Sequence, residues 1–282
     1  MTVLTPLRLD GALAALASDP SLTVVAGGTD LMVEVNSGRR RPTGLLSLRR
    51  VDELRHWRRD GDELVIGAGA TYTSLLDPAF AALAPALAQA ARTVGSPQIR
   101  NTGTLGGNLA TSSPAGDTLP VLAALDATVE LAHADADDRR TVALDDFLTG
   151  PKTNALRAGE LIVAVRIPVA AGPQEYLKIG VRNAMVIAVA SCALVVDWSR
   201  RQLGCAFGSV GPRPMRDRRA ESWLASEIDW HARRARSTTV AERFGRWMSE
   251  TVSPIDDHRA TAAYRREATA VLARRAVERV LA

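Results

Sequence analysis

Two pairs of adjacent glycines, each followed by short polar residues, are the part of this chain that could bind an anion. The first pair lies in "VVAGGTDLMVEV" (residues 24–35) and the second in "TGTLGGNLATSS" (residues 102–113). Glycine adopts positive φ at little cost and lets another group come close to the backbone. One such pair fits an ordinary tight turn as well as a concave nest of N–H groups for an oxyanion. Two of them are what a diphosphate held between two lobes needs.

The rest of the sequence offers no other known nucleotide-binding chemistry. The only lysines are Lys152 and Lys178, and neither is near a glycine loop, which favours recognition by backbone N–H groups. The stretch "VIGAGATYTS" (Val65–Ser74) begins like a dinucleotide fingerprint, but Tyr72 stands at its third glycine position. No acidic residue follows at the required distance, which argues against a Rossmann fold. The sequence also lacks GxxxxGK[ST], which excludes a P-loop NTPase.

The number and spacing of histidines and cysteines argue against a metal site. The four histidines share no ligand spacing; they are His56, His133, His231 and His258. The two cysteines, Cys192 and Cys205, lie in apolar or glycine-containing runs, which is typical of small buried residues in a reducing compartment. An iron–sulfur cluster needs about four thiolates. We therefore predict no metal ligand, and we assign no catalytic residue.

The composition predicts a globular protein of one or two domains that works in the cytoplasm. The chain has 282 residues, of which 46% are hydrophobic, and a formal net charge of +4. Arginines crowd the last third at helical spacing, which favours a helix surface that faces solvent or a partner over nucleic-acid binding. The N-terminus lacks a signal-peptide pattern, and the most apolar window, Ala79–Ala91, is too short to span a bilayer.

Hydrophobic periodicity predicts an α+β chain with a domain boundary near residue 170. The strands expected before it are Leu22–Ala26, Gly44–Leu48, Glu63–Ile66, Thr128–Leu131 and Leu161–Ile167. The helices expected there are Ala79–Thr93, Thr118–Leu125 and a short one from Thr71 to Leu76. Three antiparallel strands are expected next, at Glu175–Val181, Val186–Val196 and Gln202–Ser209. From Arg216 onward helical patterns dominate.

The motifs "AGGTDL" (Ala26–Leu31) and "TLGGN" (Thr104–Asn108) also occur in the order and with the flanks of a known family. With them the chain resembles the FAD-binding medium subunit of molybdenum hydroxylases, a family that includes carbon monoxide dehydrogenase, xanthine dehydrogenase and nicotine dehydrogenase. The resemblance covers essentially the whole chain, and "GSPQIRNTGTLGGNLATSSPAGDTLP" is its most specific part. "GELIVAVRIP" (Gly159–Pro168) resembles the strand that ends the flavin domain, and "AFGSVGPRP" resembles part of the C-terminal domain.

The resemblance implies an α+β fold in which two subdomains bind FAD, of the type shared with vanillyl-alcohol oxidase. A smaller α+β C-terminal domain would follow. The FAD-binding domain would comprise residues 1–170, and the C-terminal domain of the molybdenum hydroxylase flavoprotein subunit would comprise residues 171–282. We expect the FAD to be held non-covalently, because no histidine or cysteine lies in either glycine loop.

The resemblance also implies which residues contact FAD. The residues of the first loop that would wrap the diphosphate are Val25, Ala26, Gly27, Gly28, Thr29, Asp30 and Leu31. The facing loop would contribute Thr104, Gly106, Gly107 and Asn108. Outside the loops, the positions that match cofactor contacts of the family are Val94, Asp117, Ile162 and Lys178.

Some of these positions have a second interpretation. Lys178 matches a lysine that points toward the isoalloxazine ring, where a cation would raise the flavin potential; the alternative is a solvated strand lysine. Asp117 matches an acidic residue near the adenosine or ribityl side, but it also fits a helix N-cap. Ile162 would pack on the isoalloxazine ring and belong to the core of a strand as well. Many relatives have an acidic residue after Arg182 where this chain has Val186, which affects the surroundings of the lysine.

A bound FAD without a nearby acid–base pair or metal site describes an electron relay better than a complete enzyme. The resemblance implies an oxidoreductase subunit of the xanthine, CO or N-heterocycle dehydrogenase type. A small subunit with [2Fe–2S] clusters and a large molybdopterin subunit would be its partners, commonly in a dimer of heterotrimers. The electron acceptor would be NAD⁺, a quinone or oxygen. The alternatives are a self-sufficient flavin oxidase, which would need a base near the flavin, and a non-catalytic nucleotide-binding module.

Overall fold

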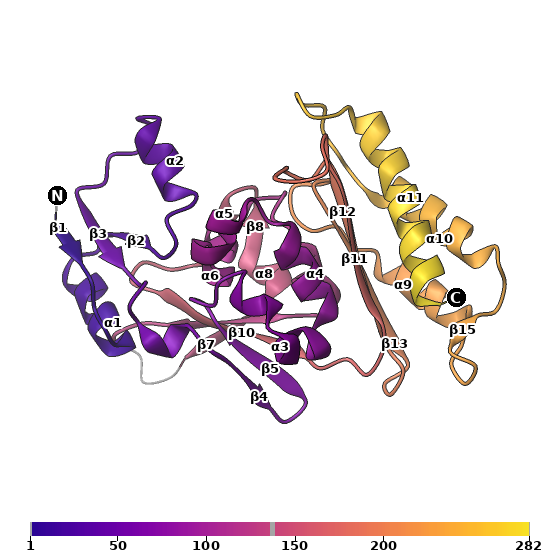
Figure 1. The fold of residues 1–282 in the computed structure, drawn as a ribbon, viewed down its shortest axis with the longest axis horizontal. Coiled ribbons are helices and arrows are strands. Elements are labelled where there is room, and N and C mark those ends of the chain that lie inside the picture. Colours follow the sequence, from indigo (N-terminus) through magenta and orange to yellow (C-terminus); the bar gives the residue numbers. More distant parts are fainter. Residues whose placement is uncertain (1, 136–138, 282) are drawn as a thin grey trace. The chain divides into compact units, whose positions relative to one another are not determined.

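The computed structural model describes residues 2–135 and 139–281, and these form two compact units. The first unit consists of Met1–Ser74, Pro97–Ser112 and Ala127–Ile167, and the second of Leu75–Ser96, Ser113–Asp126 and Pro168–Ala282. Both units combine helices with sheets, so the α+β class is confirmed (Figure 1). Because the units are discontinuous in sequence, the boundary near residue 170 stays a prediction from the sequence pattern.

A small parallel sheet with one helix forms the N-terminal part of the first unit. Its strands, in sheet order, are β1 (Thr2–Leu4), β3 (Gly44–Ser47) and β2 (Thr23–Val25). Helix α1 (Leu9–Ser18) buries Leu9, Ala12 and Leu16, whose spacing of three to four residues puts them on one helix face. These side chains share a core with Leu46 of β3. Strand β2 ends at Val25, one residue before the first glycine pair.

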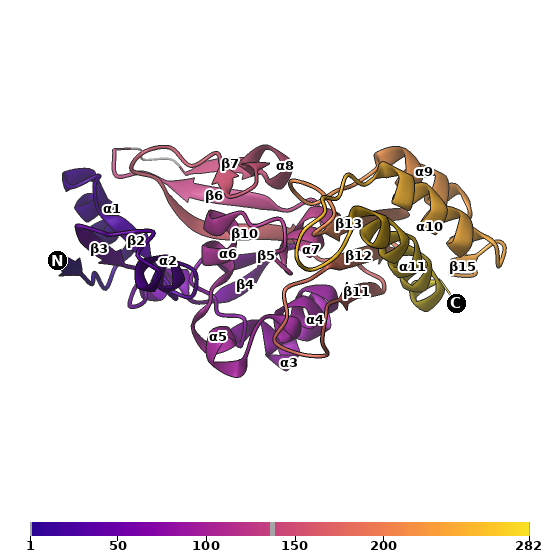
Figure 2. The ribbon, with the colours of Figure 1, turned by 90° about the horizontal axis from the view of Figure 1, so that it is seen from above.

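A sheet of five strands forms the rest of the first unit. In sheet order the strands are β4 (Trp57–Asp60), β5 (Glu63–Gly67), β10 (Leu161–Pro168), β6 (Thr128–Ala132) and β7 (Arg140–Ala143) (Figure 2). The shorter elements are α2 (Leu31–Asn36), η1 (Asp52–Leu54), α5 (Pro97–Thr102), α6 (Leu105–Thr111), α8 (Leu144–Phe147), β8 (Leu148–Gly150) and β9 (Thr153–Asn154). The central strand β10 is buried along most of its length, so its apolar residues do not alternate with polar ones.

The second unit is built on an antiparallel sheet of three strands. In sheet order these are β11 (Gln174–Ile179), β12 (Ala190–Asp197) and β13 (Gln202–Gly208). Helices α4 (Pro85–Thr93) and α7 (Leu119–Ala124) pack on one face and α11 (Ala262–Val280) on the other, as Figure 1 shows for α4 and α11. The remaining elements are α3 (Pro78–Leu83), α9 (Arg218–Ser226), β14 (Ile228–Asp229), β15 (Arg234–Ala235) and α10 (Val240–Thr251), with η2 (Ser74–Leu76) at the start of this unit.

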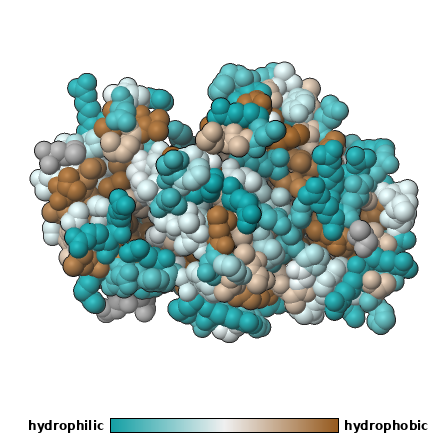
Figure 3. Space-filling view, in the orientation of Figure 1, coloured by the Kyte–Doolittle hydropathy of each residue, from teal (hydrophilic) through white to brown (hydrophobic). Residues whose placement is uncertain are grey.

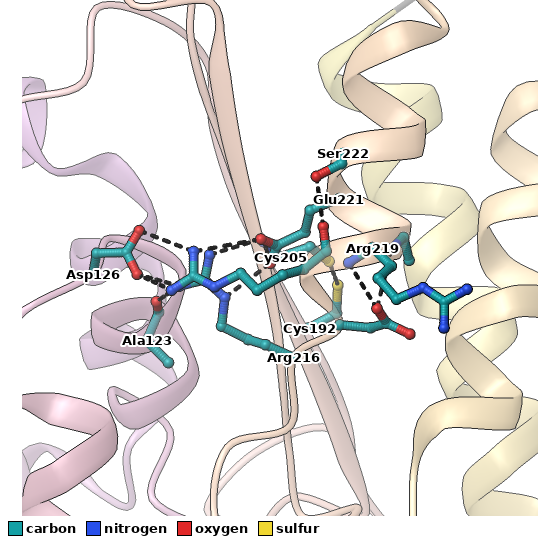
Figure 4. A network of polar contacts seen from close by, with 11 residues as sticks. Ala123, Asp126, Cys192, Cys205, Arg216, Arg219, Glu221 and Ser222 are labelled. Carbon is teal, nitrogen blue, oxygen red and sulfur yellow. Dashed lines mark hydrogen bonds and ion pairs between the residues drawn. The ribbon is translucent and has the colours of Figure 1, made fainter.

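A buried arginine ties α7 to the C-terminal helices (Figure 4). The Arg216 guanidinium pairs with Glu221 at 2.8 Å and with Asp126 at 2.8 Å, and it donates to the Ala123 carbonyl. Glu221 also accepts the backbone N–H of Cys205 at 2.9 Å. Because both side chains of the Arg216–Glu221 pair are buried, removing either partner would leave an uncompensated charge. The network therefore fixes α7 on β13 and α9.

The expected strands agree with the structure within two residues, with one exception. The strand expected over Val186–Val196 begins only at Ala190, because the preceding residues form the loop in which Val186 packs on Gly180. The helix expected over Ala79–Thr93 is wrong as one element. Pro85 begins a new helix there, since proline lacks the N–H that a continuous helix requires.

Three further expectations about helices can be compared with the structure. The helix expected over Thr118–Leu125 is confirmed as α7, and the helical C-terminal region is confirmed as α9, α10 and α11. Thr71 accepts the Ser74 N–H at 3.1 Å, as expected for a residue that caps a short helix. Helices α5 and α6 were not expected, because the glycine-rich sequence between residues 97 and 111 has low helix propensity.

Hydrophobic residues on the face shown in Figure 3 form small groups among hydrophilic ones. Among the large apolar residues that are exposed are Val181, Met185 and Ile187, which lie in the loop between β11 and β12. None of the helices formed by residues 2–135 and 139–281 is long and apolar enough to cross a membrane.

Candidate cofactor site

The first glycine pair lies in a loop between β2 and α2, and the backbone N–H groups of this loop are available as hydrogen-bond donors. Gly28 has a φ of 73°, a region that favours glycine, and its carbonyl accepts the Met32 N–H at 2.9 Å. The N–H groups of residues 27–31 donate to no acceptor in the part of the chain that the structure describes. Consecutive free N–H groups form a concave nest for anionic oxygens. This loop can therefore hold an anion without a cationic side chain.

The second glycine pair lies in the first turn of α6, and its backbone N–H groups are occupied. Four successive N–H groups have acceptors within the unit: Leu105 donates to Ala70, Gly106 to Ala68, Gly107 to the Thr104 side chain and Asn108 to the Thr104 carbonyl. Thr104 is thus the N-cap of the helix. The expectation that both loops present free N–H groups is wrong for the second loop, because it begins a helix and not a turn.

The two glycine pairs are brought together by close backbone contacts. A Cβ on Gly27 would overlap the Thr102 carbonyl oxygen, so no side chain fits at this position. A Cβ on Gly106 would lie 2.6 Å from the Cβ of Ala68. The Asp30 carboxylate is hydrogen-bonded to the Thr111 side chain of α6, and desolvation raises the pKa of this carboxyl. Gly27 therefore allows the first loop to lie directly against Thr102, just before the second pair, and Gly106 allows α6 to lie directly against Ala68.

A small apolar cavity lies beside the first loop. Its volume is about 140 Å³, and its lining includes Ala26, Gly106, Gly107, Ile162 and Leu161. Ile162 is a buried residue of β10, so it lies in a strand core, as expected, and also faces this cavity. The structure thus brings Ile162 together with residues from both glycine loops.

A larger cavity next to the first loop is lined by arginines. Its volume is about 510 Å³, and Arg49, Arg50 and Arg55 line it together with Gly27. Arg49 and Arg50 are exposed and form no ion pair with an acid among residues 2–135 and 139–281. Clustered cations attract anionic ligands through their field. The interpretation of the glycine loops took only lysines into account and did not include these arginines, although Arg49 and Arg50 directly follow the expected strand Gly44–Leu48.

The remaining predicted contacts, Val94, Asp117 and Lys178, lie in the second unit. Lys178 donates to Asp117 Oδ2 at 2.6 Å and to the Thr93 carbonyl at 3.2 Å. The side chains of Lys178 and Asp117 are 7% and 8% exposed, so the alternative of a solvated strand lysine is wrong. The Tyr176 hydroxyl donates to the other Asp117 oxygen at 2.9 Å. Val94 follows Thr93 at the end of α4 and is half-buried.

The Asp117 carboxylate does not cap a helix. Helix α7 has Thr118 as its N-cap residue, and no side chain caps it by a hydrogen bond. Burial raises the pKa of the Asp117 carboxyl above its ordinary value, and the charge of Lys178 opposes this shift. Burial also raises the pKa of Tyr176, so its hydroxyl stays protonated and able to donate. The sequence analysis missed Tyr176, although it lies two residues before Lys178 and hence on the same strand face.

The cysteines and histidines play no part in the candidate site. Cys192 and Cys205 are free and buried with their sulfur atoms 3.9 Å apart, which confirms that they are small core residues. In the portion of the chain that the structure describes, no group of three or more His, Cys, Asp or Glu side chains could hold a metal ion.

Two family models together match nearly the whole chain. Residues 1–170 match the family described as the FAD binding domain in molybdopterin dehydrogenase. Residues 175–280 match the CO dehydrogenase flavoprotein C-terminal domain. The expected fold class, an α+β FAD-binding fold followed by an α+β C-terminal domain, is in agreement with these matches.

Individual relatives are similar over most of their length. The chain is 30% identical over 276 residues to the glyceraldehyde dehydrogenase medium chain of Sulfolobus acidocaldarius. The aligned region covers 96% of this chain and 95% of the relative. It is 36% identical over 215 residues to the nicotinate dehydrogenase FAD-subunit of Eubacterium barkeri, covering 71% of each. In the solved structure of quinoline 2-oxidoreductase from Pseudomonas putida 86, a chain of 26% identity superimposes with a TM-score of 0.90, covering 99% of this chain and 96% of that one.

Proposed function

The chain belongs to the family of FAD-binding subunits of molybdopterin dehydrogenases, and we propose that it is the electron relay of such a complex. It is an oxidoreductase subunit of the molybdenum hydroxylase type. In this proposal the chain holds FAD non-covalently, and electrons reach it from the [2Fe–2S] clusters of a partner subunit. The electrons leave to an external acceptor, for which NAD⁺, a quinone and oxygen are the candidates.

The observation that carries this proposal is the run of free N–H groups at residues 27–31. A diphosphate presents anionic oxygens that such N–H groups bind well. The apolar cavity that Ile162 lines lies beside this loop and suits part of an aromatic ring. Arg49 and Arg50 add a positive field on the neighbouring cavity. Neither loop contains histidine or cysteine, which supports non-covalent binding.

The chain's own residues bind and orient the cofactor. When bound, FAD supplies the ability to accept electrons one at a time and to pass them on. Residues 25–31 would wrap the diphosphate, and the α6 segment with Thr104, Gly106, Gly107 and Asn108 would form the facing wall. An ammonium has three N–H donors, and Lys178 uses two of them on Asp117 and Thr93. The third N–H can donate to an acceptor atom of a ligand.

The partners in this proposal are those of the family. A small subunit with [2Fe–2S] clusters would deliver electrons, and a large molybdopterin-binding subunit would hydroxylate the substrate. The assembly would be a dimer of heterotrimers. The relatives are dehydrogenases and oxidoreductases of chemically different substrates, named for glyceraldehyde, nicotinate and quinoline. This variety fits a flavin subunit that leaves substrate choice to another subunit.

The test compares the full chain expressed alone with the chain co-expressed with its two partner subunits. Alone, it should contain about one FAD per chain, released by acid, and should show no substrate-dependent flavin reduction. With both partners, substrate should reduce the flavin. Substrate-dependent reduction by the isolated chain would contradict the relay and support a self-sufficient oxidase. A colourless chain that cannot be reconstituted with FAD would support a nucleotide-binding module.

A further inference from the structure

The cavity of about 510 Å³ beside the first glycine loop is lined by three arginines and, in the described part of the chain, by no acidic residue. The arginines are Arg49, Arg50 and Arg55, and all three are exposed. Arg55 lies 3.9 Å from Asp52, which does not line the cavity. Arg49 and Arg50 have no ion-pair partner among the described residues. The cavity therefore has a positive charge that the protein leaves largely uncompensated.

Polar groups of the first unit add hydrogen-bond donors to this cavity. Thr104 lines it and is only 6% exposed; its hydroxyl accepts the Gly107 N–H but donates to no acceptor in the described part of the chain. The Asn101 side chain accepts from Thr73 through Oδ1, which leaves its amide N–H groups for another partner. The N–H of Gly27 is free as well. Cations together with free N–H and O–H donors are the groups that bind phosphate oxygens.

This cavity differs from the nest of N–H groups in the first loop. Of residues 27–31, only Gly27 lines the cavity. The N–H groups of residues 28–31 are therefore available to a group bound outside it. FAD has a single diphosphate, and under the proposed function that diphosphate occupies the nest. The three arginines are then left for a second anion.

Size and charge indicate the chemical class of the second ligand. Cavities of about 300–1,000 Å³ hold small organic molecules, and this one falls within that range. Arginine binds phosphate through two parallel N–H···O bonds, so three arginines can bind both groups of a diphosphate. We propose that the arginine-lined cavity binds the diphosphate of a second ligand, which is held beside FAD and not in place of it. The inference rests on the proposed function, because that function assigns the diphosphate of FAD to the first loop.

Calorimetric titration of the FAD-saturated full chain with inorganic pyrophosphate tests this inference. We expect saturable binding of about one pyrophosphate per chain, without release of FAD. The affinity should fall as NaCl is added, because the arginines are exposed and salt screens their charges. Pyrophosphate that binds the FAD-free chain but not the FAD-saturated one would overturn the inference, because the cavity would then serve FAD itself. Binding that does not saturate would overturn it too.

Paired substitutions show whether the pyrophosphate lies in this cavity. With FAD saturating, Arg49→Gln combined with Arg50→Gln should weaken pyrophosphate binding at least about tenfold, since two charge-assisted contacts are lost. Arg58→Gln combined with Arg59→Gln is the matched control. These adjacent arginines of β4 are exposed in the same unit, do not line the cavity, and change the net charge by the same amount. Equal losses in the two variants, or no loss in either, would overturn the inference.

The outcomes separate this inference from the proposed function. A chain that takes up FAD but then binds no pyrophosphate overturns the inference alone. A chain that takes up no FAD contradicts the proposed function, and pyrophosphate binding that is the same in both double variants would then overturn the arginine site as well. If the Arg49 and Arg50 variant does not fold, Arg55→Gln applies the same test. A loss of affinity no larger than that of Arg59→Gln would overturn the inference.

Discussion

Gly27-Gly28 and Gly106-Gly107 lie in the same compact unit, and the hydrogen bonds of their backbones differ in kind. The N–H groups of residues 27–31 find no acceptor among residues 2–135 and 139–281, whereas those of residues 105–108 are all bonded within the unit. An anion can bind free N–H groups directly, but it would have to compete with existing hydrogen bonds at the second pair. In the proposed site the first pair would therefore bind the anion, and the second would form the facing wall.

Within each pair, the two glycines also meet different structural requirements. Gly27 and Gly106 allow close contact, because a Cβ there would overlap a neighbouring segment. Gly28 allows a φ of 73° and has room for a side chain. Gly107 is a helical residue whose Cβ would lie 3.0 Å from Thr104 Oγ1. These differences predict a graded series of effects.

Gly27→Ala should have the largest effect. Its Cβ would overlap the backbone of Thr102, which cannot move as a flexible side chain can, so the loop must separate from α5 and α6. We expect a loss of about 3 kcal/mol in the free energy of unfolding and no bound FAD. Urea unfolding and flavin absorbance would measure both. Gly11→Ala is the control, because its Cβ would meet only Pro6 at 3.6 Å; wild-type stability in Gly27→Ala would contradict the contact.

Gly106→Ala should come next. Its Cβ would lie 2.6 Å from the Ala68 Cβ and 2.7 Å from the Ala68 carbonyl, which also accepts the Gly106 N–H. We expect a loss of about 2 kcal/mol in the free energy of unfolding. FAD binding should weaken because the wall shifts. Gly107→Ala is the matched control in the same helix turn, and it should change stability by less than Gly106→Ala. Equal effects of the two substitutions would contradict the assigned packing.

Gly28→Ala should separate binding from packing. The side chain has room, with Met32 Cγ at 3.5 Å, but positive φ costs about 1 kcal/mol for a non-glycine residue. We expect FAD affinity to fall about tenfold as the nest changes shape, equivalent to about 1.4 kcal/mol. Gly38→Ala carries the same strain, with a φ of 72°, outside both loops. Calorimetric titration with FAD should show a loss for Gly28→Ala only, and a similar loss for Gly38→Ala would count against the nest.

Thr104→Ala should have the smallest effect on FAD. The hydroxyl accepts the Gly107 N–H at 3.0 Å as a helix cap, so its loss should cost about 1 kcal/mol of stability. FAD affinity should fall by less than in Gly28→Ala. Thr104→Ser keeps the cap and should match the wild type in thermal unfolding. An affinity loss in Thr104→Ala larger than in Gly28→Ala would reverse the assigned roles of the two pairs.

Local patterns predicted most strands but not the state of the second glycine pair. Glycine has low helix propensity, so a helix through Gly106-Gly107 is not expected from the sequence. Its first turn is held by the carbonyls of Ala68 and Ala70, more than thirty residues earlier, which no local pattern reveals. The break at Pro85, by contrast, follows from a residue that was visible and whose effect is local.

For the polar residues of the candidate site, too, the sequence reveals local relations but not contacts between residues far apart in the chain. The family resemblance pointed to Lys178 and Asp117, and the structure adds that they form a buried pair. Tyr176 could have been found from its position two residues before Lys178 on a predicted strand. That Asp117 accepts from both and does not cap α7 depends on how the chain folds between residues 117 and 176, and the sequence leaves this open.

Amide hydrogen exchange of the full chain, with and without FAD, tests the central claim most directly. Free N–H groups exchange rapidly, and a bound diphosphate should protect them. The account predicts that FAD slows exchange at residues 27–31, while residues 105–108 are already protected without FAD. Fast exchange at residues 27–31 in the presence of saturating FAD, or FAD-dependent protection at residues 105–108 alone, would contradict it.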